Sequence, residues 1–297
     1  MAIKSPILLI TFNRPEHTRR VLDAVLAVQP YVLYVFQDGA REGNEKDKEK
    51  CAEVRRTVAE LTKKNNVILH TKYSDRNLGC GPGPFEAMTW FFQNEEKGII
   101  LEDDIYPHPL FFTYMDDLLE RYRNENAVGM VTAHNLQRYY SRRNSYYFTY
   151  EMAGTLGWGT WRRVWEKFDF NIPFDAHLLN ESLRGYGIHK LQRKRILKAN
   201  KIWLSGDRHD GWDYQFDYYL LVNHYLNARA NSCLTSHEGD DEDATHCGYS
   251  NPGYKMEVNV SLFEPLRHPS KIKIDPSVKL RLLKNEIRIM LRKLHIK

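Results

Sequence analysis

The sequence predicts an α/β protein built around a mainly parallel sheet, and two observations support this fold class. Short runs of β-branched, aliphatic and aromatic residues alternate with longer segments whose apolar residues recur at helical spacing. The short runs are almost continuously apolar, which is typical of strands buried on both faces of a sheet. These runs are Ile7–Thr11, Val32–Phe36, Val67–His70 and Gly98–Leu101.

The segments between these runs are expected to be helices, and they span Pro15–Val28, Glu45–Lys64 and Phe85–Glu96. Pro15 suits the first turn of a helix, and Asn13 is expected to cap that helix. The alternation of strands and helices makes the first half of the chain Rossmann-like. Ligands of such sheets bind beyond the carboxyl ends of the strands.

The second half of the chain is less regular. A helix is expected over Phe111–Arg123, a strand over Val128–Thr132 and a helix from Trp212 onward. A loop rich in glycine and tryptophan is expected over residues 154–161, and a mobile loop over residues 237–253. We expect one domain in two halves, followed by a basic C-terminal tail with a helix. These three parts span residues 1–135, 136–265 and 266–297.

The net charge of +5 comes from the C-terminus, because residues 279–297 contain seven basic residues and one acid. The rest of the chain is close to neutral, which disfavours a nucleic-acid partner. The four cysteines form no CxxC pair, which argues against secretion and against a cysteine-based zinc site. No apolar run approaches the ~20 residues of a membrane-spanning helix or forms a signal-peptide core, so a cytoplasmic protein is expected.

Three consecutive acids, Glu102-Asp103-Asp104, directly follow the fourth strand. Adjacent carboxylates are electrostatically costly unless a cation or a set of donors lies nearby. Carboxylate oxygens are also the ligands that Mg²⁺ or Mn²⁺ prefers, and Asp38 brings another acid to the same edge of the sheet. The alternatives are a solvated turn or a helix cap for the triplet, and an Asp-Gly turn for Asp38.

Two further segments contain residue types that suit a binding site. Trp212-Asp213 places a carboxylate beside an aromatic ring at the start of a helix, where Asp213 is otherwise expected to be the cap. His246 follows an acidic run, and metal ligation there competes with a solvated loop. The Gly/Pro-rich segment 77–84 indicates a rigid turn rather than a phosphate loop, because it contains no Walker motif.

Taken in order, these motifs resemble those of nucleotide-sugar-dependent glycosyltransferases of the GT-A fold. The similarity is greatest to the N-acetylglucosaminyltransferase I group and its bacterial sugar-transferase and haemolytic-protein-like relatives, and it covers roughly residues 5–250. The residues that carry it are ILLITFNRPEHTRRVLD (7–23), Gln37-Asp38, ILEDDI (100–105), Leu156-Gly157-Trp158 and Trp212-Asp213. The segment 79–84 and the sequence after Asp213 depart from the family, so its acceptor specificity does not carry over.

The resemblance implies a role for each candidate residue. Asp104 would bind Mn²⁺ (or Mg²⁺), and His246 would lie on a loop that closes over the donor, as a second candidate metal ligand. Asp213 would be the catalytic base. The residues expected to bind the nucleotide and the donor sugar are Arg14, Asp38, Arg76, Glu102, Asp103, Gly157 and Trp158. Among them, Asp38 would lie by the base, taken to be uracil, and Arg14 by the diphosphate.

The activity implied by the resemblance is inverting, metal-dependent transfer of GlcNAc or a related hexose from a UDP-sugar, in polysaccharide biosynthesis. The acceptor would be a hydroxyl group of a glycan or of a lipid-linked sugar. The cation would neutralise the leaving diphosphate, and one carboxylate would deprotonate the incoming hydroxyl group. Residues 1–135 would bind the nucleotide sugar, and residues 136–265 would form the acceptor side.

Two alternatives remain open. A sugar-nucleotide nucleotidyltransferase would share the fold and its acidic edge, although it normally has a Gly-rich triphosphate loop where this chain has Phe12-Asn13-Arg14-Pro15. A non-catalytic, haemolysin-like protein would act on membranes through its basic tail.

The tail, residues 279–297, is expected to form an amphipathic helix. Its apolar residues share one face and are Leu280, Leu283, Ile287, Met290 or Leu291, and Leu294. Such a helix can lie on anionic lipid, which would place the protein peripherally on the inner face of the plasma membrane. Packing of the same apolar stripe on the body of the protein is the alternative.

Overall fold

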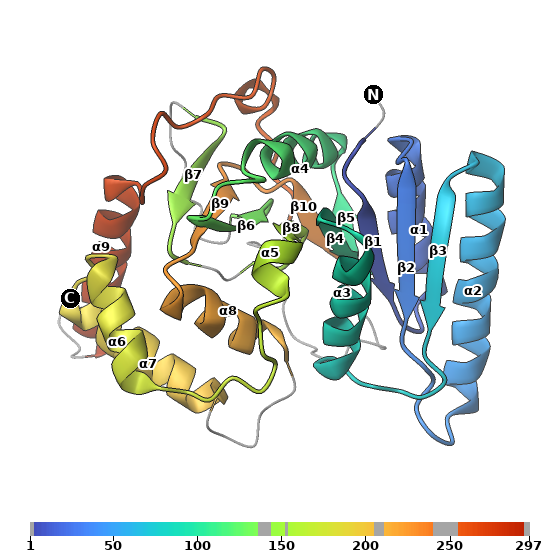
Figure 1. Ribbon diagram of the computed structural model, residues 1–297, viewed down its shortest axis with the longest axis horizontal. Helices are drawn as coiled ribbons and strands as arrows, with labels where there is room; N and C mark the ends of the chain where they lie inside the picture. The colour runs from blue at the N-terminus through green and yellow to red at the C-terminus, as the bar shows by residue number, and fades with distance from the viewer. Residues whose placement is uncertain (1–2, 136–143, 152–153, 205–210, 240–254, 294–297) are drawn as a thin grey trace.

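The computed structural model describes residues 3–135, 144–151, 154–204, 211–239 and 255–293 (Figure 1). Its strands are β1 (Ile7–Thr11), β2 (Val32–Gln37), β3 (Ile68–Tyr73), β4 (Lys97–Glu102), β5 (Ile105–Pro107), β6 (Val128–Thr132), β7 (Tyr146–Thr149), β8 (Trp158–Trp161), β9 (Leu226–Ala230) and β10 (Thr235–His237). Its α-helices are α1 (Pro15–Ala27), α2 (Glu45–Asn65), α3 (Pro82–Asn94), α4 (Pro109–Arg121), α5 (Arg162–Trp165), α6 (Ala176–Gly185), α7 (Lys190–Leu204), α8 (Asp213–Val222) and α9 (Pro276–Lys293).

Within the described residues, eight strands form one sheet in the order β3-β2-β1-β4-β8-β6-β9-β7. The first four strands of this order are parallel to one another. β8 runs antiparallel between β4 and β6, and β7 runs antiparallel to β9 at the far edge. β10 and β5 form a separate antiparallel pair. The predicted α/β fold, with a mainly parallel sheet flanked by helices, is therefore confirmed.

The four strands predicted in the first half are all present, with ends that shift by up to three residues. Every side chain of β1 and β2 is buried, since helices cover both faces of the sheet. In Figure 1, α3 lies in front of this part of the sheet and α1 lies behind it. The outermost strand, β3, contains only half-buried and exposed residues.

The register of the parallel strands places their carboxyl ends together. Thr11 at the end of β1 pairs with Gln37 at the end of β2, and Ile10 pairs with Glu102 at the end of β4. Polar residues that follow these strands therefore meet at one edge of the sheet. This is the edge at which ligands of such folds bind.

The two halves of the chain share the sheet. Ile100 in β4 pairs with Trp158 in β8, which joins the strands before residue 135 to those after it. An aromatic block then positions α8: Trp158 stacks on Trp212, with ring centroids 5.4 Å apart, and Phe216 contacts both rings. The division of the chain into two halves and a tail, with its boundaries, stays a prediction.

Two sequence-based expectations concern the environment of the chain. Cys51, Cys80 and Cys233 are free thiols, and Cys247 lies outside the described residues. None of the helices in the described ranges combines the length and the apolar character that crossing a bilayer requires.

Candidate functional site

The acidic triplet lies at the carboxyl edge of the sheet, where the sequence predicts it. Glu102 ends β4, and Asp103 and Asp104 form the turn into β5. The triplet does not cap the next helix, because the N-cap of α4 is His108, whose side chain accepts a hydrogen bond from the Leu110 N–H. One carboxylate oxygen of Asp103 accepts a 3.0 Å hydrogen bond from the Phe12 N–H, directly after β1.

Arg14 provides the positive charge of the site. It lies between β1 and α1, and its guanidinium donates a 2.8 Å hydrogen bond to Oδ2 of Asp104 and lies 3.7 Å from Oδ1 of Asp103. The side chain is 12% exposed, so water screens these ion pairs only in part. Pro15 occupies the first turn of α1 as predicted, but Asn13 is not the cap: Arg14 takes the N-cap position, and Asn13 donates to Asp47 instead.

His237 is a site residue that sequence reasoning missed. It ends β10, where it pairs with Ile105 of β5, and its Nε2 lies 3.4 Å from Oδ2 of Asp104. The Glu238 N–H donates a 2.9 Å hydrogen bond to the Asp104 carbonyl. Residues 237–239 therefore close over Asp104, and the expectation of a mobile loop is wrong for these three residues.

The backbone at Gly239 passes close to the Asp104 carboxylate. A Cβ atom at this position would lie 2.3 Å from Oδ2 of Asp104, well inside van der Waals contact. Only glycine lets the backbone pass here without displacing the carboxylate.

The carboxyl groups of the triplet have different electrostatic environments. Burial favours the neutral form of Asp104, but His237 and Arg14 outweigh burial and lower the pKa of this carboxyl. For Glu102 the balance is reversed: burial first, and then the charges of Asp104, Asp103 and Asp213, raise its pKa to about 8, and the Arg14 charge offsets them only in part. The same turn therefore shifts the pKa values of two neighbouring carboxyl groups in opposite directions.

Asp213 lies near this cluster, since its charge contributes to the raised pKa of Glu102. It is the first residue of α8, whose N-cap is Trp212, so capping does not account for it. One turn later, burial and the Asp213 charge raise the pKa of Asp217. The charge of Asp213 therefore acts both on Glu102 of the triplet and on Asp217 of α8.

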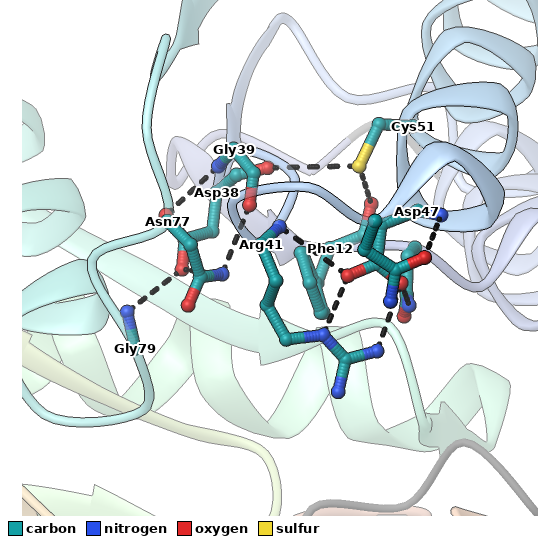
Figure 2. Close-up of polar contacts among 10 residues, drawn as sticks. Phe12, Asp38, Gly39, Arg41, Asp47, Cys51, Asn77 and Gly79 are labelled. Atoms are coloured by element: carbon teal, nitrogen blue, oxygen red, sulfur yellow. Dashed lines mark hydrogen bonds and ion pairs between the residues drawn. The ribbon is translucent and has the colours of Figure 1, made fainter.

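Asp38 has a structural role in this chain (Figure 2). Its Oδ1 accepts hydrogen bonds from the N–H groups of Gly39 and Leu78, and its Oδ2 accepts from the Gly79 N–H and the Asn77 side chain. Burial raises the pKa of Asp38, and the three backbone donors partly offset that effect. These four donors occupy the carboxylate, so the expected contact with a nucleotide base is not supported by the geometry.

The other nucleotide-binding candidates are divided between surface and core. Arg76 is exposed, and its backbone packs over Gly39, where a Cβ would lie 2.5 Å from the Arg76 carbonyl carbon. Gly157 has a φ of +82° and fits beneath Thr235. Trp158 is fully buried in the aromatic block. That Trp158 binds the donor sugar stays a prediction; in the structure its buried ring packs against Trp212, directly before α8.

A metal site is not preformed by the described residues. No three His, Cys, Asp or Glu side chains among them are arranged to hold a metal ion, and Asp104 faces Arg14 and His237 instead. His246, the second candidate ligand, lies outside the described residues. The donor set suits a cation that one or two carboxylates hold together with a substrate phosphate, which is how proteins usually bind Mg²⁺.

A second polar cluster lies at the start of α2 (Figure 2). Asp47 is buried and accepts two hydrogen bonds from the Arg41 guanidinium and one from the Asn13 side chain. The Arg41 hydrogen bonds are the main reason why the pKa of Asp47 is lowered. The cluster ties the segment after β1, which ends in Arg14, to the start of α2.

Asp47→Asn is expected to lower the free energy of unfolding by about 1–3 kcal/mol, because buried hydrogen bonds to a charged group are lost. A carboxyl whose pKa is lowered by folding stabilises the protein above its unfolded pKa of ~3.9 and loses this contribution as the pH falls through its folded pKa. The free energy of unfolding of variant and wild type, measured by urea unfolding at pH 7 and at decreasing pH, should therefore differ by an amount that shrinks below about pH 3.9. Asp23 is exposed, and Asp23→Asn is the control. A difference in the free energy of unfolding between Asp47→Asn and wild type that persists at low pH would contradict the prediction.

The solved structures that resemble this chain do so only slightly. No family model and no curated protein matches the chain. An apo UDP-glucose pyrophosphorylase is similar at a TM-score of 0.40 and 9% identity, over 77% of this chain and 90% of the other. The inositol-1-phosphate CTP transferase of T. maritima is similar at a TM-score of 0.37 and 8% identity, over 77% and 85% of the two chains. A 4-diphosphocytidyl-2C-methyl-D-erythritol synthase from Anaerococcus prevotii is similar at a TM-score of 0.35 and 12% identity, over 58% and 79%.

These findings correct the functional expectation. The similar structures carry the names of nucleotidyl-transferring enzymes, so they contradict the expected glycosyl transfer and agree with the first alternative, sugar-nucleotide nucleotidyl transfer. The sheet order fits a GT-A-like fold in the broad sense. The likeness in structure is slight, and the function proposed next therefore rests on the residues of this chain.

Proposed function

We propose that this chain is a nucleotidyltransferase that forms or cleaves a nucleotide sugar. The observation that carries the proposal is the position of Arg14 between β1 and α1, paired with Asp103 and Asp104 at the end of β4. A guanidinium beside two carboxylates, at the carboxyl edge of a parallel sheet, supplies both the cation that binds a phosphate and the oxygens that bind a divalent ion.

The reaction moves a nucleotidyl group between two phosphates. A phosphate oxygen of the sugar phosphate attacks the α-phosphorus of a nucleoside triphosphate, the bond to the β-phosphate breaks, and its electron pair leaves with pyrophosphate. Negative charge on the phosphate oxygens is the main obstacle, and Arg14 is placed to neutralise it. A divalent cation, when bound, would be held by Asp104 and would supply further charge neutralisation.

The nucleophile needs no base in this reaction, because a phosphate monoester is mostly doubly ionised at neutral pH. Asp213 then has another task. Its carboxylate, beside Glu102 on the acceptor side, is suited to accept hydrogen bonds from hydroxyl groups of the sugar.

Asp213→Asn is accordingly expected to raise the KM for the sugar phosphate by about 10-fold, the size of a lost hydrogen bond to a charged group, with a small effect on kcat. Steady-state kinetics at varied sugar phosphate would measure the change. The converse result, a fall in kcat of about 10²-fold at unchanged KM, would assign Asp213 to general-base catalysis on a hydroxyl group and contradict the proposed nucleophile.

Pyrophosphate release tests the proposed function directly. The full chain would be incubated with UTP or CTP, a panel of sugar 1-phosphates, and Mg²⁺ or Mn²⁺. Release that requires both substrates supports the proposal, as does formation of UTP from a UDP-sugar and pyrophosphate. The absence of turnover with every pair, in both directions and with both metals, would exclude it.

A further inference from the structure

The positive charge of this protein is concentrated on two helices that pack against each other at one end of the molecule. α7 and α9 contact each other and lie at the far end from α2 (Figure 1). Each helix contains six lysine or arginine residues, and their only acidic residue is Glu286. The remainder of the chain has more acids than bases, so this end carries a charge opposite to that of the rest.

The inner face of α9 is used for packing. Val278 and Leu282 are buried against the body, and the Lys279 ammonium donates to the Tyr186 carbonyl oxygen. Glu286 is 11% exposed and forms an ion pair with Arg195 of α7. The one acid of the helix is therefore turned inward and neutralised, which leaves the outer face free of negative charge.

The outer face of α9 is both apolar and basic. Leu280, Ile287 and Leu291 are 54%, 37% and 38% exposed, and their spacing of seven and four residues places them on one side of the helix. Lys284 and Arg288, both exposed, lie between them. The contact with the body of the protein thus uses Val278 and Leu282, whereas Leu280, Ile287 and Leu291 of the predicted apolar stripe remain exposed to solvent.

A shallow hollow of about 300 Å³ runs along the same face. Its lining combines three cations with one leucine and two small polar side chains, which are Ser277, Leu280, Arg281, Lys284, Asn285 and Arg288. Three cations around one hollow suit an anionic headgroup, and the neighbouring leucine and isoleucine suit acyl chains.

We propose that the outer face of α9 docks on the surface of an anionic phospholipid bilayer. Basic residues near such a surface are attracted by its negative potential, and apolar side chains that alternate with them enter the interface. A nucleic acid or an acidic polysaccharide would satisfy the charges but would leave Leu280, Ile287 and Leu291 in contact with water. The bilayer is the partner that satisfies both features of this face.

Vesicle co-sedimentation of the full chain tests the proposal. Wild type should sediment with phosphatidylcholine vesicles that contain phosphatidylglycerol and should stay in solution with pure phosphatidylcholine. Lys284→Glu/Arg288→Glu should weaken binding by at least ~10-fold, because two attractive charges become repulsive. Leu280→Asn/Ile287→Asn should also weaken binding to vesicles, while elution from a cation-exchange column stays as in wild type.

The matched control is Lys46→Glu/Lys63→Glu, which makes the same change in net charge at exposed positions of α2, at the opposite end of the molecule. This control should bind the vesicles as wild type does. Equal loss of binding in the α2 and α9 charge variants would show that only net charge matters and would overturn the proposal. Binding of wild type to RNA or to heparin, without any binding to the anionic vesicles, would also overturn it.

Discussion

Arg14→Ala is expected to lower kcat/KM for pyrophosphate release by about 10³-fold, the lower end of the contribution that an arginine makes to phosphoryl transfer. The guanidinium is held by Asp103 and Asp104 in a position that is 12% exposed, so its charge is already oriented before substrate arrives. A preorganised charge of this kind needs no reorganisation during the reaction, and water that enters the space left by alanine cannot replace it.

Two further variants serve as controls for Arg14→Ala. Arg20→Ala removes a guanidinium from α1, the helix that begins directly after Arg14. Arg20 is 53% exposed and pairs with Glu238, so its loss should change kcat/KM by less than about threefold. Arg14→Lys keeps the charge and loses the planar fork, and should fall between wild type and alanine. Turnover of Arg14→Ala near the wild-type rate would remove Arg14 from the proposed role.

Stability must be measured beside activity, because Arg14 also holds the acidic turn together. Without the guanidinium, Asp103 and Asp104 lose their shared counter-ion and repel each other and Glu102. Thermal unfolding of the variant should therefore show a modest loss of stability. A variant that remains folded at the assay temperature and is still inactive separates the chemical role from the structural one.

The first half of the fold was predictable because its signals are local. β1, β2 and β4 are read from runs of apolar residues that burial within the sheet requires to be nearly continuous. β3, at the edge of the sheet, is read from the shorter run Val67–His70. Their parallel order then places Glu102-Asp103-Asp104 at the functional edge. Only the ends of the strands, and the cap of α1, were set by contacts that the local sequence does not contain.

His237 illustrates what the local sequence does not contain. It reaches Asp104 because β10 pairs with β5, a strand more than a hundred residues earlier in the chain. Neither strand exceeds three residues, so neither produces a recognisable pattern. A Thr-Ser-His segment before an acidic loop is a weak signal for a site residue. The sequence alone therefore favours His246, which follows the acidic run.

Asp38 and Trp158 illustrate a different difficulty. Both residue types suit a binding site, but in this structure other parts of the protein surround each of them. Asp38 accepts four hydrogen bonds from its own chain, and Trp158 is enclosed by Trp212 and Phe216. A sequence motif gives the position of such a residue along the chain, but only the packing shows whether its functional group faces a ligand.

For a similar reason, the sequence motifs do not distinguish glycosyl transfer from nucleotidyl transfer. Both reactions hold a nucleotide's phosphates at the carboxyl edge of a parallel sheet, and both use acids and a cation to do so. The order of the motifs therefore predicts a nucleotide site, whereas the bond that breaks depends on which atom the second substrate presents. We expect the second half of the domain to bind that substrate, and its sequence pattern is the least regular.

Gly239→Ala is expected to lower kcat/KM by about 10²-fold, although the substitution adds a single methyl group at some distance from any phosphate. The new Cβ would lie 2.3 Å from Oδ2 and 3.0 Å from Cγ of Asp104, so either the carboxylate or the 237–239 backbone must move. Movement of the carboxylate breaks its contacts with Arg14 and His237, and a displacement of about 1 Å in a catalytic group is enough for a loss of this size.

Gly83→Ala is the matched control for Gly239→Ala. Gly83 lies in α3, and the nearest atom to its added Cβ would be 3.6 Å away, which is an ordinary contact. Because alanine favours a helix over glycine, this control should keep full activity and gain up to about 1 kcal/mol of stability. A Gly239→Ala variant with wild-type kcat/KM would show that Asp104 tolerates displacement, and the carboxylate would then not be the group that fixes the substrate phosphates.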